Sequence, residues 1–173
     1  MKWVLIVLVS AAVLVTIVLA IGALLPRTHV ASRTLHVRRS PEEIWTLITD
    51  VDRFTSWRPD LTRVERLPDR NGHAAWVEHT SSGAIPLETI ESVPPERLVL
   101  GIADPTLPFG GTWTYAVERV ADGSALKITE DGYVSNPLFR FVSRVVIGHH
   151  RTIDAYLTNV ARRFDEEAAL SGQ

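Results

Sequence analysis

The sequence predicts an α+β fold: a curved antiparallel sheet of seven strands wrapped around a long C-terminal helix, with one N-terminal transmembrane helix added. Three observations carry this prediction. Residues 3–25 are uncharged and apolar, residues 61–134 alternate strand patterns with turn signals, and residues 136–170 carry apolar side chains at spacings of three and four. Short turns between successive strands make the pairing antiparallel, because a parallel pair needs a long crossover.

Composition narrows the class of protein. The chain has 173 residues, a formal net charge of −2 and no cysteine. This length suits one domain of ordinary size with an appendage. The small net charge does not indicate nucleic-acid binding, and the lack of cysteine excludes disulfides and thiolate metal sites. We divide the chain into an anchor at 1–27, a folded domain at 28–168 and a tail at 169–173.

The N-terminal apolar run is long enough to cross a bilayer. At about 1.5 Å per residue, residues 3–25 cover roughly 34 Å, against a hydrocarbon core of about 30 Å. The alternative is a cleaved signal peptide with a cleavage-like site at Ala20, Gly22 and Ala23, but the usual apolar region of a signal peptide is only about 7 to 15 residues. We expect an uncleaved single-pass anchor. Four arginines follow the apolar run: Arg27, Arg33, Arg38 and Arg39. By the positive-inside rule, we expect the folded domain on the cytoplasmic side.

The folded domain begins with a strand and a capped helix. Residues 29–37 alternate in strand fashion. Ser40 then provides an N-cap, Pro41 occupies the first helical position, and Glu43 completes a capping box three residues after the cap. A second short helical turn is expected over residues 51–57.

Six further strand patterns follow, separated by turn signals. The pairs Asn71-Gly72 and Asp122-Gly123 are typical of tight hairpins. The predicted strands cover residues 61–67, 73–80, 84–93, 97–102, 112–120 and 124–133.

The C-terminal segment predicts a helix over residues 136–170. On a period of 3.6 residues its apolar side chains form one stripe, which consists of Ile153, Tyr156, Leu157, Val160 and Phe164. Residues 137–147 are instead apolar on nearly every side, so Gly148 marks a joint. We expect the later part to grip the sheet, and the earlier part to cover the mouth of the fold or lean towards the membrane.

A curved sheet closed by one helix leaves space on its concave side, which predicts a cavity for a small apolar ligand. Alternation gives the last two strands one apolar side each, and continuing the parity of the second strand puts Glu130 on that side. The predicted ligand-binding residues are Trp76, Trp113, Tyr115, Val117, Leu126, Ile128, Glu130, His149, Ile153 and Tyr156.

Glu130 and His149 are also the candidate catalytic residues, because periodicity places both on apolar faces of adjoining elements. A buried carboxylate is costly unless it is paired, and a carboxylate–imidazole pair suits proton abstraction beside a carbonyl, or loss of water. Alternatively, Glu130 reaches solvent or a helix N–H while His149 only packs. The adjacent helical residues His149 and His150 point about 100° apart, and His73 and His79 lack a third ligand, so we expect no metal site. No motif indicates a cofactor.

Four short motifs in the folded domain are similar to those of a known superfamily. They are Ser40-Pro41-Glu42-Glu43-Ile44-Trp45, Asp50-Val51-Asp52-Arg53-Phe54, Trp57-Arg58-Pro59 and Gly111-Thr112-Trp113. With the order of elements, they resemble the START-like helix-grip superfamily and its SRPBCC branch of polyketide cyclases/dehydrases and lipid-transport proteins, over residues 28–167. The resemblance implies a ligand held between sheet and helix: a lipid, sterol, quinone or polyketide. It also implies that a minority of members catalyse cyclisation or dehydration.

The sequence therefore predicts a membrane-anchored binding protein for an apolar ligand, such as a lipid, quinone or polyketide-like molecule. One alternative is a cyclase or dehydratase that uses Glu130 and His149 as acid and base. Another is a scaffold or interaction domain whose cavity is filled by its own side chains. The expected partners are the apolar ligand and the lipid bilayer, and not nucleic acid.

Overall fold

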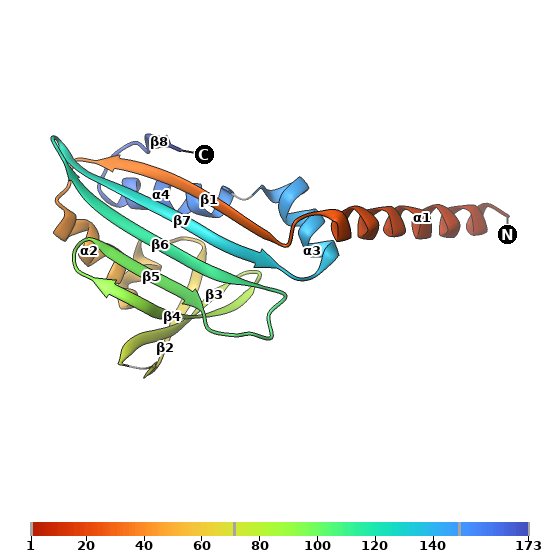
Figure 1. Ribbon diagram of the computed structural model, residues 1–173, viewed down its shortest axis with the longest axis horizontal. Helices are drawn as coiled ribbons and strands as arrows, with labels where there is room; N and C mark the ends of the chain where they lie inside the picture. Colours follow the sequence, from red (N-terminus) through yellow and green to blue (C-terminus); the bar gives the residue numbers. More distant parts are fainter. Residues whose placement is uncertain (1, 71, 149, 173) are drawn as a thin grey trace.

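The structure is a computed structural model that describes residues 2–70, 72–148 and 150–172. Figure 1 shows a helix-covered sheet with one long helix projecting from one end. The helical elements are α1 (Lys2–Leu24), α2 (Pro41–Thr49), the 3-10 turn η1 (Val51–Ser56), α3 (Pro137–Phe141), the π-helical segment η2 (Val142–Ile147) and α4 (Arg151–Arg163). The strands are β1 (Thr28–Val37), β2 (Leu61–Arg70), β3 (His73–Thr80), β4 (Gly83–Val93), β5 (Arg97–Ile102), β6 (Phe109–Val120), β7 (Gly123–Val134) and β8 (Leu170–Ser171).

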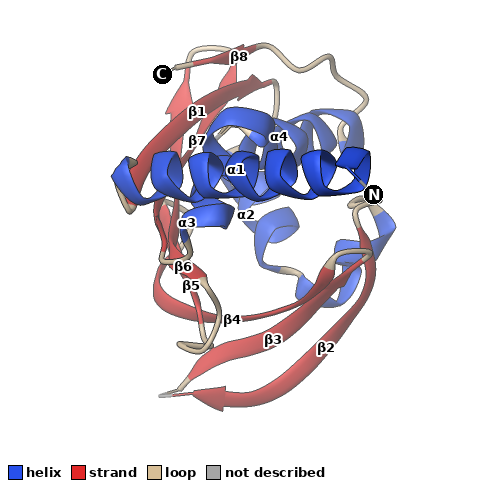
Figure 2. Ribbon diagram, turned by 90° about the vertical axis from the view of Figure 1, so that its right-hand side faces the viewer, coloured by secondary structure: helices blue, strands red, loops and turns tan. Residues whose placement is uncertain are grey.

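The strands form one antiparallel sheet in the order β2-β3-β4-β5-β6-β7-β1-β8. All seven predicted strands are confirmed, and the turn after β2 includes Gly72, whereas Asn71 lies outside the described residues. The sheet curves around the helices, so that β2, β3 and β4 bend away from β1 and β7 in Figure 2. This is the α+β helix-grip architecture that the sequence predicts.

The predicted helix over residues 136–170 is wrong at its C-terminal end. Helix α4 stops at Arg163, and Asp165 takes a φ of 59°. The N–H of Glu166 donates to the carbonyl of Ala161, which closes the helix end in a Schellman arrangement. The chain then turns back, and Leu170–Ser171 adds β8 to the edge of β1.

The predicted joint at Gly148 is confirmed. Gly148 has a φ of 79°, a left-handed conformation that glycine adopts without steric cost. It separates the segment formed by α3 and η2 from α4. The stripe of α4 faces the sheet as expected, with Ile153, Leu157 and Val160 fully buried.

Helix α2 begins as its capping signals predict. The hydroxyl of Ser40 accepts from the N–H of Glu43, and the Glu43 carboxylate accepts from the N–H of Ser40. The helix packs on β6 and β7 and buries Ile44 and Ile48. Together α2 and α4 cover one end of the concave face of the sheet.

Helix α1 is long and apolar enough to cross a membrane, and its last turn is built into the domain. A side chain at Gly22 would overlap the carbonyl of Pro137 in α3. From α3, the buried Arg140 donates to the carbonyls of Leu25 at 3.0 Å and Ser135 at 2.8 Å. Only residues 25–27 separate α1 from β1, so the helix joins the sheet without a long tether.

Candidate functional site

The concave face of the sheet has a closed half and a cavity half. In the closed half, α2 and α4 press on Leu35, Val117, Leu126 and Ile128, which are all buried. The cavity half encloses a space of about 330 Å³. The cavity-lining residues are Phe54, Arg58, Asp60, Glu78, Thr80, Ile85, Leu87, Leu100, Ile102, Phe109, Gly110, Gly111, Thr112, Trp113, Tyr115, Glu130, Gly132, Thr152 and Tyr156.

The cavity lies at the end of the sheet that α1 joins. In an antiparallel sheet, the ends of β3, β5 and β7 meet the starts of β1, β4 and β6 at one end. Thr80, Ile102 and Gly132 come from those strand ends, and Phe109 comes from a strand start. Because β1 follows α1 directly, the cavity is next to the N-terminal helix, as the run of the strands in Figure 1 shows.

An aromatic wall separates the cavity from the closed half. The ring of Tyr156 meets those of Trp57, Trp113 and Tyr115 at centroid distances of 5.4, 5.9 and 5.6 Å. Burial within this wall raises the pKa of both the Tyr115 and the Tyr156 hydroxyl. They are therefore neutral polar groups on the cavity wall at physiological pH.

A buried ion pair lies against the same wall. Arg58 donates to both carboxylate oxygens of Glu78, at 2.7 and 2.9 Å, and to Asp60 at 3.0 Å. Its guanidinium also lies over the rings of Phe54 and Tyr156. Burial alone would lower the pKa of Arg58, but the adjacent Glu78 carboxylate raises it above its ordinary value. The pair is thus charged, and it fixes η1 to β3.

At the other side of the cavity, Glu130 pairs with a histidine. Its Oε1 lies 2.9 Å from Nε2 of His29 on β1. The register of β1 on β7 sets His29 opposite Gly132. A side chain at Gly132 would come within 2.7 Å of the His29 ring, so the glycine leaves room for His29 to reach Glu130.

The structure describes nine of the ten predicted ligand-binding residues, and they fall into three groups. Trp113, Tyr115, Glu130 and Tyr156 line the cavity. Val117, Leu126, Ile128 and Ile153 lie in the closed half, and Trp76 is buried behind the wall, where its indole N–H donates to Glu78. His149 lies outside the described residues, so its pairing with Glu130 stays a prediction.

Three polar residues of the site were not predicted from the sequence: Arg58, Glu78 and His29. Glu78 lies two residues after Trp76 on β3, so strand parity already puts it on the concave side. Arg58 belongs to one of the motifs that mark the fold. His29 had no comparable signal, because its position depends on the register between β1 and β7. Within the described residues, no group of three or more His, Asp or Glu side chains is arranged to hold a metal ion.

Comparison with known proteins gives the chain its relatives. Residues 28–165 match the family described as polyketide cyclase/dehydrase and lipid transport. Among curated protein sequences, no relative matches significantly. Several solved structures share the fold at sequence identities of 13 to 21%.

A START superfamily protein from Mycobacterium smegmatis has a TM-score of 0.64 at 14% identity, over 79% of this chain and 97% of its own. Norcoclaurine synthase from Thalictrum flavum has a TM-score of 0.63 at 13% identity, over 81% of this chain and 88% of its own. The di-domain ARO/CYC StfQ from the steffimycin biosynthetic pathway has a TM-score of 0.60 at 13% identity, over 80% of this chain and 53% of its own. Such identities establish the fold alone, whereas the family match covers most of the chain. The chain therefore belongs to the polyketide cyclase/dehydrase and lipid transport family, as its motifs predict.

Proposed function

We propose that this protein is a membrane-anchored binding protein that holds a small apolar ligand between its sheet and α4. One observation carries the proposal: a cavity of about 330 Å³, lined mainly by apolar side chains, lies at the end of the sheet that α1 joins. A molecule that leaves the bilayer beside α1 has a short path into this cavity. Pockets of this size and lining are typical of small-molecule sites.

The packing of α1 supports an uncleaved anchor. Cleavage after Ala23 would remove Gly22, which packs against Pro137, and the Ala23 carbonyl, to which Arg140 donates at 3.5 Å. A signal peptide has no such role in the mature fold. On α3, beside the end of α1, Leu138 and Phe139 are about half exposed at 48% and 51%. Side chains of this kind suit the bilayer interface.

The orientation of the anchor is part of the proposal. Arg33 bonds to Asp154, and Arg39 lies over Phe164, so both belong to the folded domain. The backbone N–H of Arg38 also donates to Glu166, so Arg27 remains as a flanking charge after α1, and it supports a domain on the cytoplasmic side. Protease protection of the full chain tests this: a cytoplasmic domain should be protected in cells and digested in inverted vesicles, whereas an anchor of the opposite orientation would give the reverse pattern.

A narrowed cavity mouth tests ligand binding. Thr152 lies exposed on the first turn of α4 and lines the cavity, whereas Ala155 is exposed on the outer face of the same helix. We expect Thr152→Trp to lower the amount of lipid that is extracted with the purified full chain and identified by mass spectrometry. Ala155→Trp is the matched control. Equal lipid in both variants and the wild type, or none in any, would contradict the proposal; a protein without ligand would favour a scaffold.

A second candidate function is acid–base catalysis in the same cavity. The observation that favours it is the 2.9 Å contact between Glu130 and His29 on the cavity side of the sheet. A carboxylate oriented by imidazole can remove a proton from the carbon next to a ketone and return it to the resulting enolate. The cyclase and synthase among the structural neighbours share this fold.

Deuterium exchange at the carbons beside the carbonyl of 2-decanone tests this activity. The wild-type chain in D₂O should exchange these hydrogens faster than buffer, and Glu130→Gln should remove the acceleration. Glu118→Gln, on an exposed residue of β6, is the control. An exchange rate that does not differ between wild type and Glu130→Gln would exclude Glu130 as the base.

A further inference from the structure

The charges around the cavity are unequal. The charged cavity-lining side chains are one cation, Arg58, and three carboxylates: Asp60, Glu78 and Glu130. The two terminal nitrogens of Arg58 are already bonded to Glu78 and Asp60, so the positive charge of Arg58 is compensated by these neighbouring carboxylates. Glu130 is left with His29 as its partner. Among the lining residues that the structure describes, carboxylates therefore outnumber cations three to one.

Polar atoms on the cavity wall remain for a ligand. The contact of Glu130 with His29 uses Oε1, and no hydrogen bond to Oε2 from a described residue accompanies it. Thr152 and Tyr156 also line the cavity, and both carry hydroxyls. A ligand hydroxyl can donate to the Glu130 carboxylate, and a ligand carbonyl oxygen can accept from a hydroxyl of the lining. Nε of Arg58 has no hydrogen-bond acceptor within the described residues, but it is buried and out of reach of a ligand.

An anion does not fit this cavity. Near Arg58, it would lie close to both carboxylates that bond the same guanidinium. Beside Glu130, it would face a like charge in a partly buried site, where screening by water is weak. A carboxylate or phosphate also loses its hydration on entering an apolar space.

We infer that the cavity selects an uncharged apolar molecule bearing a hydroxyl or carbonyl oxygen, and rejects the anions of fatty acids and phospholipids. This inference rests on the proposed binding function and narrows its ligand class. The oxygen is held by Glu130 or Thr152, and the apolar body lies along Leu87, Leu100 and Trp113.

Decanol and decanoate test the selection, because they share a chain and differ in the charge of the head group. Titration calorimetry with the full chain in amphipol at pH 8, where decanoate is ionised, should show decanol binding at least about tenfold more tightly. Glu130→Gln removes one negative charge, so it should raise decanoate affinity several-fold and narrow the difference between the two probes.

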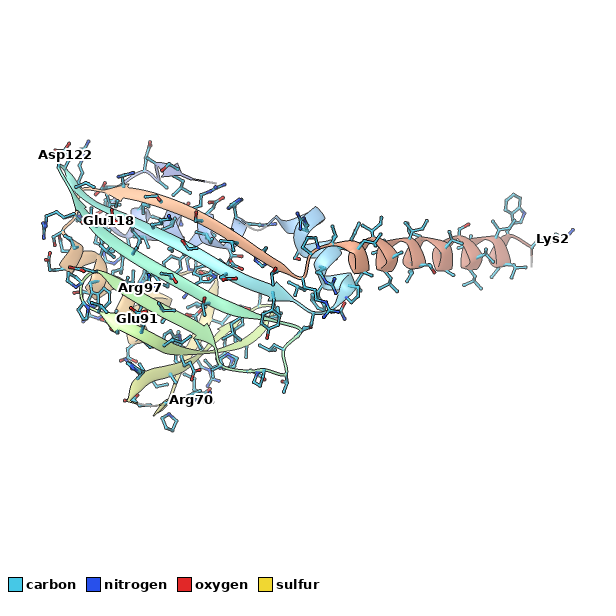
Figure 3. All side chains as sticks on the ribbon, in the orientation of Figure 1. Lys2, Arg70, Glu91, Arg97, Glu118 and Asp122 are labelled. Carbon is cyan, nitrogen blue, oxygen red and sulfur yellow. The ribbon has the colours of Figure 1, made fainter. Side chains whose placement is uncertain are left out.

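Glu118→Gln is the matched control. Glu118 lies near the end of β6 remote from α1, outside the cavity (Figure 3), and this variant should change neither affinity. Equal affinities for the two probes, or a decanoate affinity that Glu130→Gln does not raise, would overturn the inference and leave the binding function intact. If Thr152→Trp also left decanol binding unchanged, or if neither probe bound, the proposed function itself would fail.

Discussion

The two halves of the concave face are built from the same strands, yet one is a sealed core and the other a cavity. On β7, Leu126 and Ile128 are fully buried, while Glu130 and Gly132, further along the same face, line the cavity. On β6, Val117 is buried in the closed half, and Trp113 borders the cavity. Strand parity is identical in both halves. The difference is what lies above them.

Helix placement produces that difference. Helix α2 packs on β6 and β7, and the stripe of α4 covers the same region. At the other end, the described residues of α4 that line the cavity are Thr152 and Tyr156, from its first two turns, and the chain before α4 runs towards α1. The closed half therefore contains the packed core that stabilises the fold, and the cavity half contains the space for a ligand. The aromatic wall around Tyr156 is the boundary.

The largest expected effect comes from breaking the ion pair at this boundary. Arg58→Met leaves the Glu78 carboxylate buried without its cation, and we expect a loss of about 3–5 kcal/mol in the free energy of unfolding. Urea denaturation of the full chain in amphipol measures it. The double variant Arg58→Met with Glu78→Gln keeps an acceptor for Trp76 and should recover at least half of the loss. No recovery would mean that Arg58 acts through packing rather than charge.

The same substitution in each half compares them directly. Leu126→Ala removes a side chain that is 0% exposed, and should cost about 2–5 kcal/mol in the free energy of unfolding. Leu87→Ala should cost about 1 kcal/mol or less, because one side of Leu87 already faces the cavity. Equal losses in the two variants would contradict the division into a closed and a cavity half.

Removing the N-cap destabilises α2, one of the two helices that cover the closed half. Ser40→Ala abolishes the capping box, and we expect a loss of about 1 kcal/mol in the free energy of unfolding. Ser92→Ala, at an exposed strand position, should stay within about 0.5 kcal/mol of wild type. Thermal denaturation followed by circular dichroism separates the two, and a Ser40→Ala variant as stable as Ser92→Ala would exclude this role.

Alkaline pH acts on the aromatic wall. The pKa of Tyr115 and Tyr156 is raised by burial in the folded protein, whereas in the unfolded chain both titrate near the usual value of about 10. Their neutral forms therefore stabilise the fold fully below about pH 10, and that contribution is lost as the pH rises further. The free energy of unfolding should fall above pH 10, and Tyr115→Phe should reduce the slope. An unchanged slope would show that Tyr115 ionises equally in both states.

The sequence determined most of the fold and only part of the site. Local signals such as the Ser40 capping box and the joint at Gly148 act over a few residues, and both are confirmed. Alternation correctly assigns Glu130 to the concave face. It does not reveal how far along a strand the covering helices extend, so core residues such as Leu126 and Ile128 were expected in the cavity.

Long-range register accounts for the rest. His29 reaches Glu130 because the register of β1 on β7 sets His29 opposite Gly132. No sequence pattern within β1 predicts this register. The end of α4 was misplaced for a related reason. The residues after Arg163 continue an acceptable helical composition, but the left-handed turn at Asp165 sends them to the sheet edge as β8.

Photolabelling tests the central claim, a ligand space beside the membrane anchor, most directly. The full chain in liposomes is irradiated with a long-chain alcohol that carries a diazirine, and the labelled peptides are mapped by mass spectrometry. We predict labels on residues 109–115 and 152–156, in addition to those on α1, and a loss of the domain labels when excess decanol competes or when Thr152 is replaced by Trp. Labels confined to α1 and α3 would contradict the account.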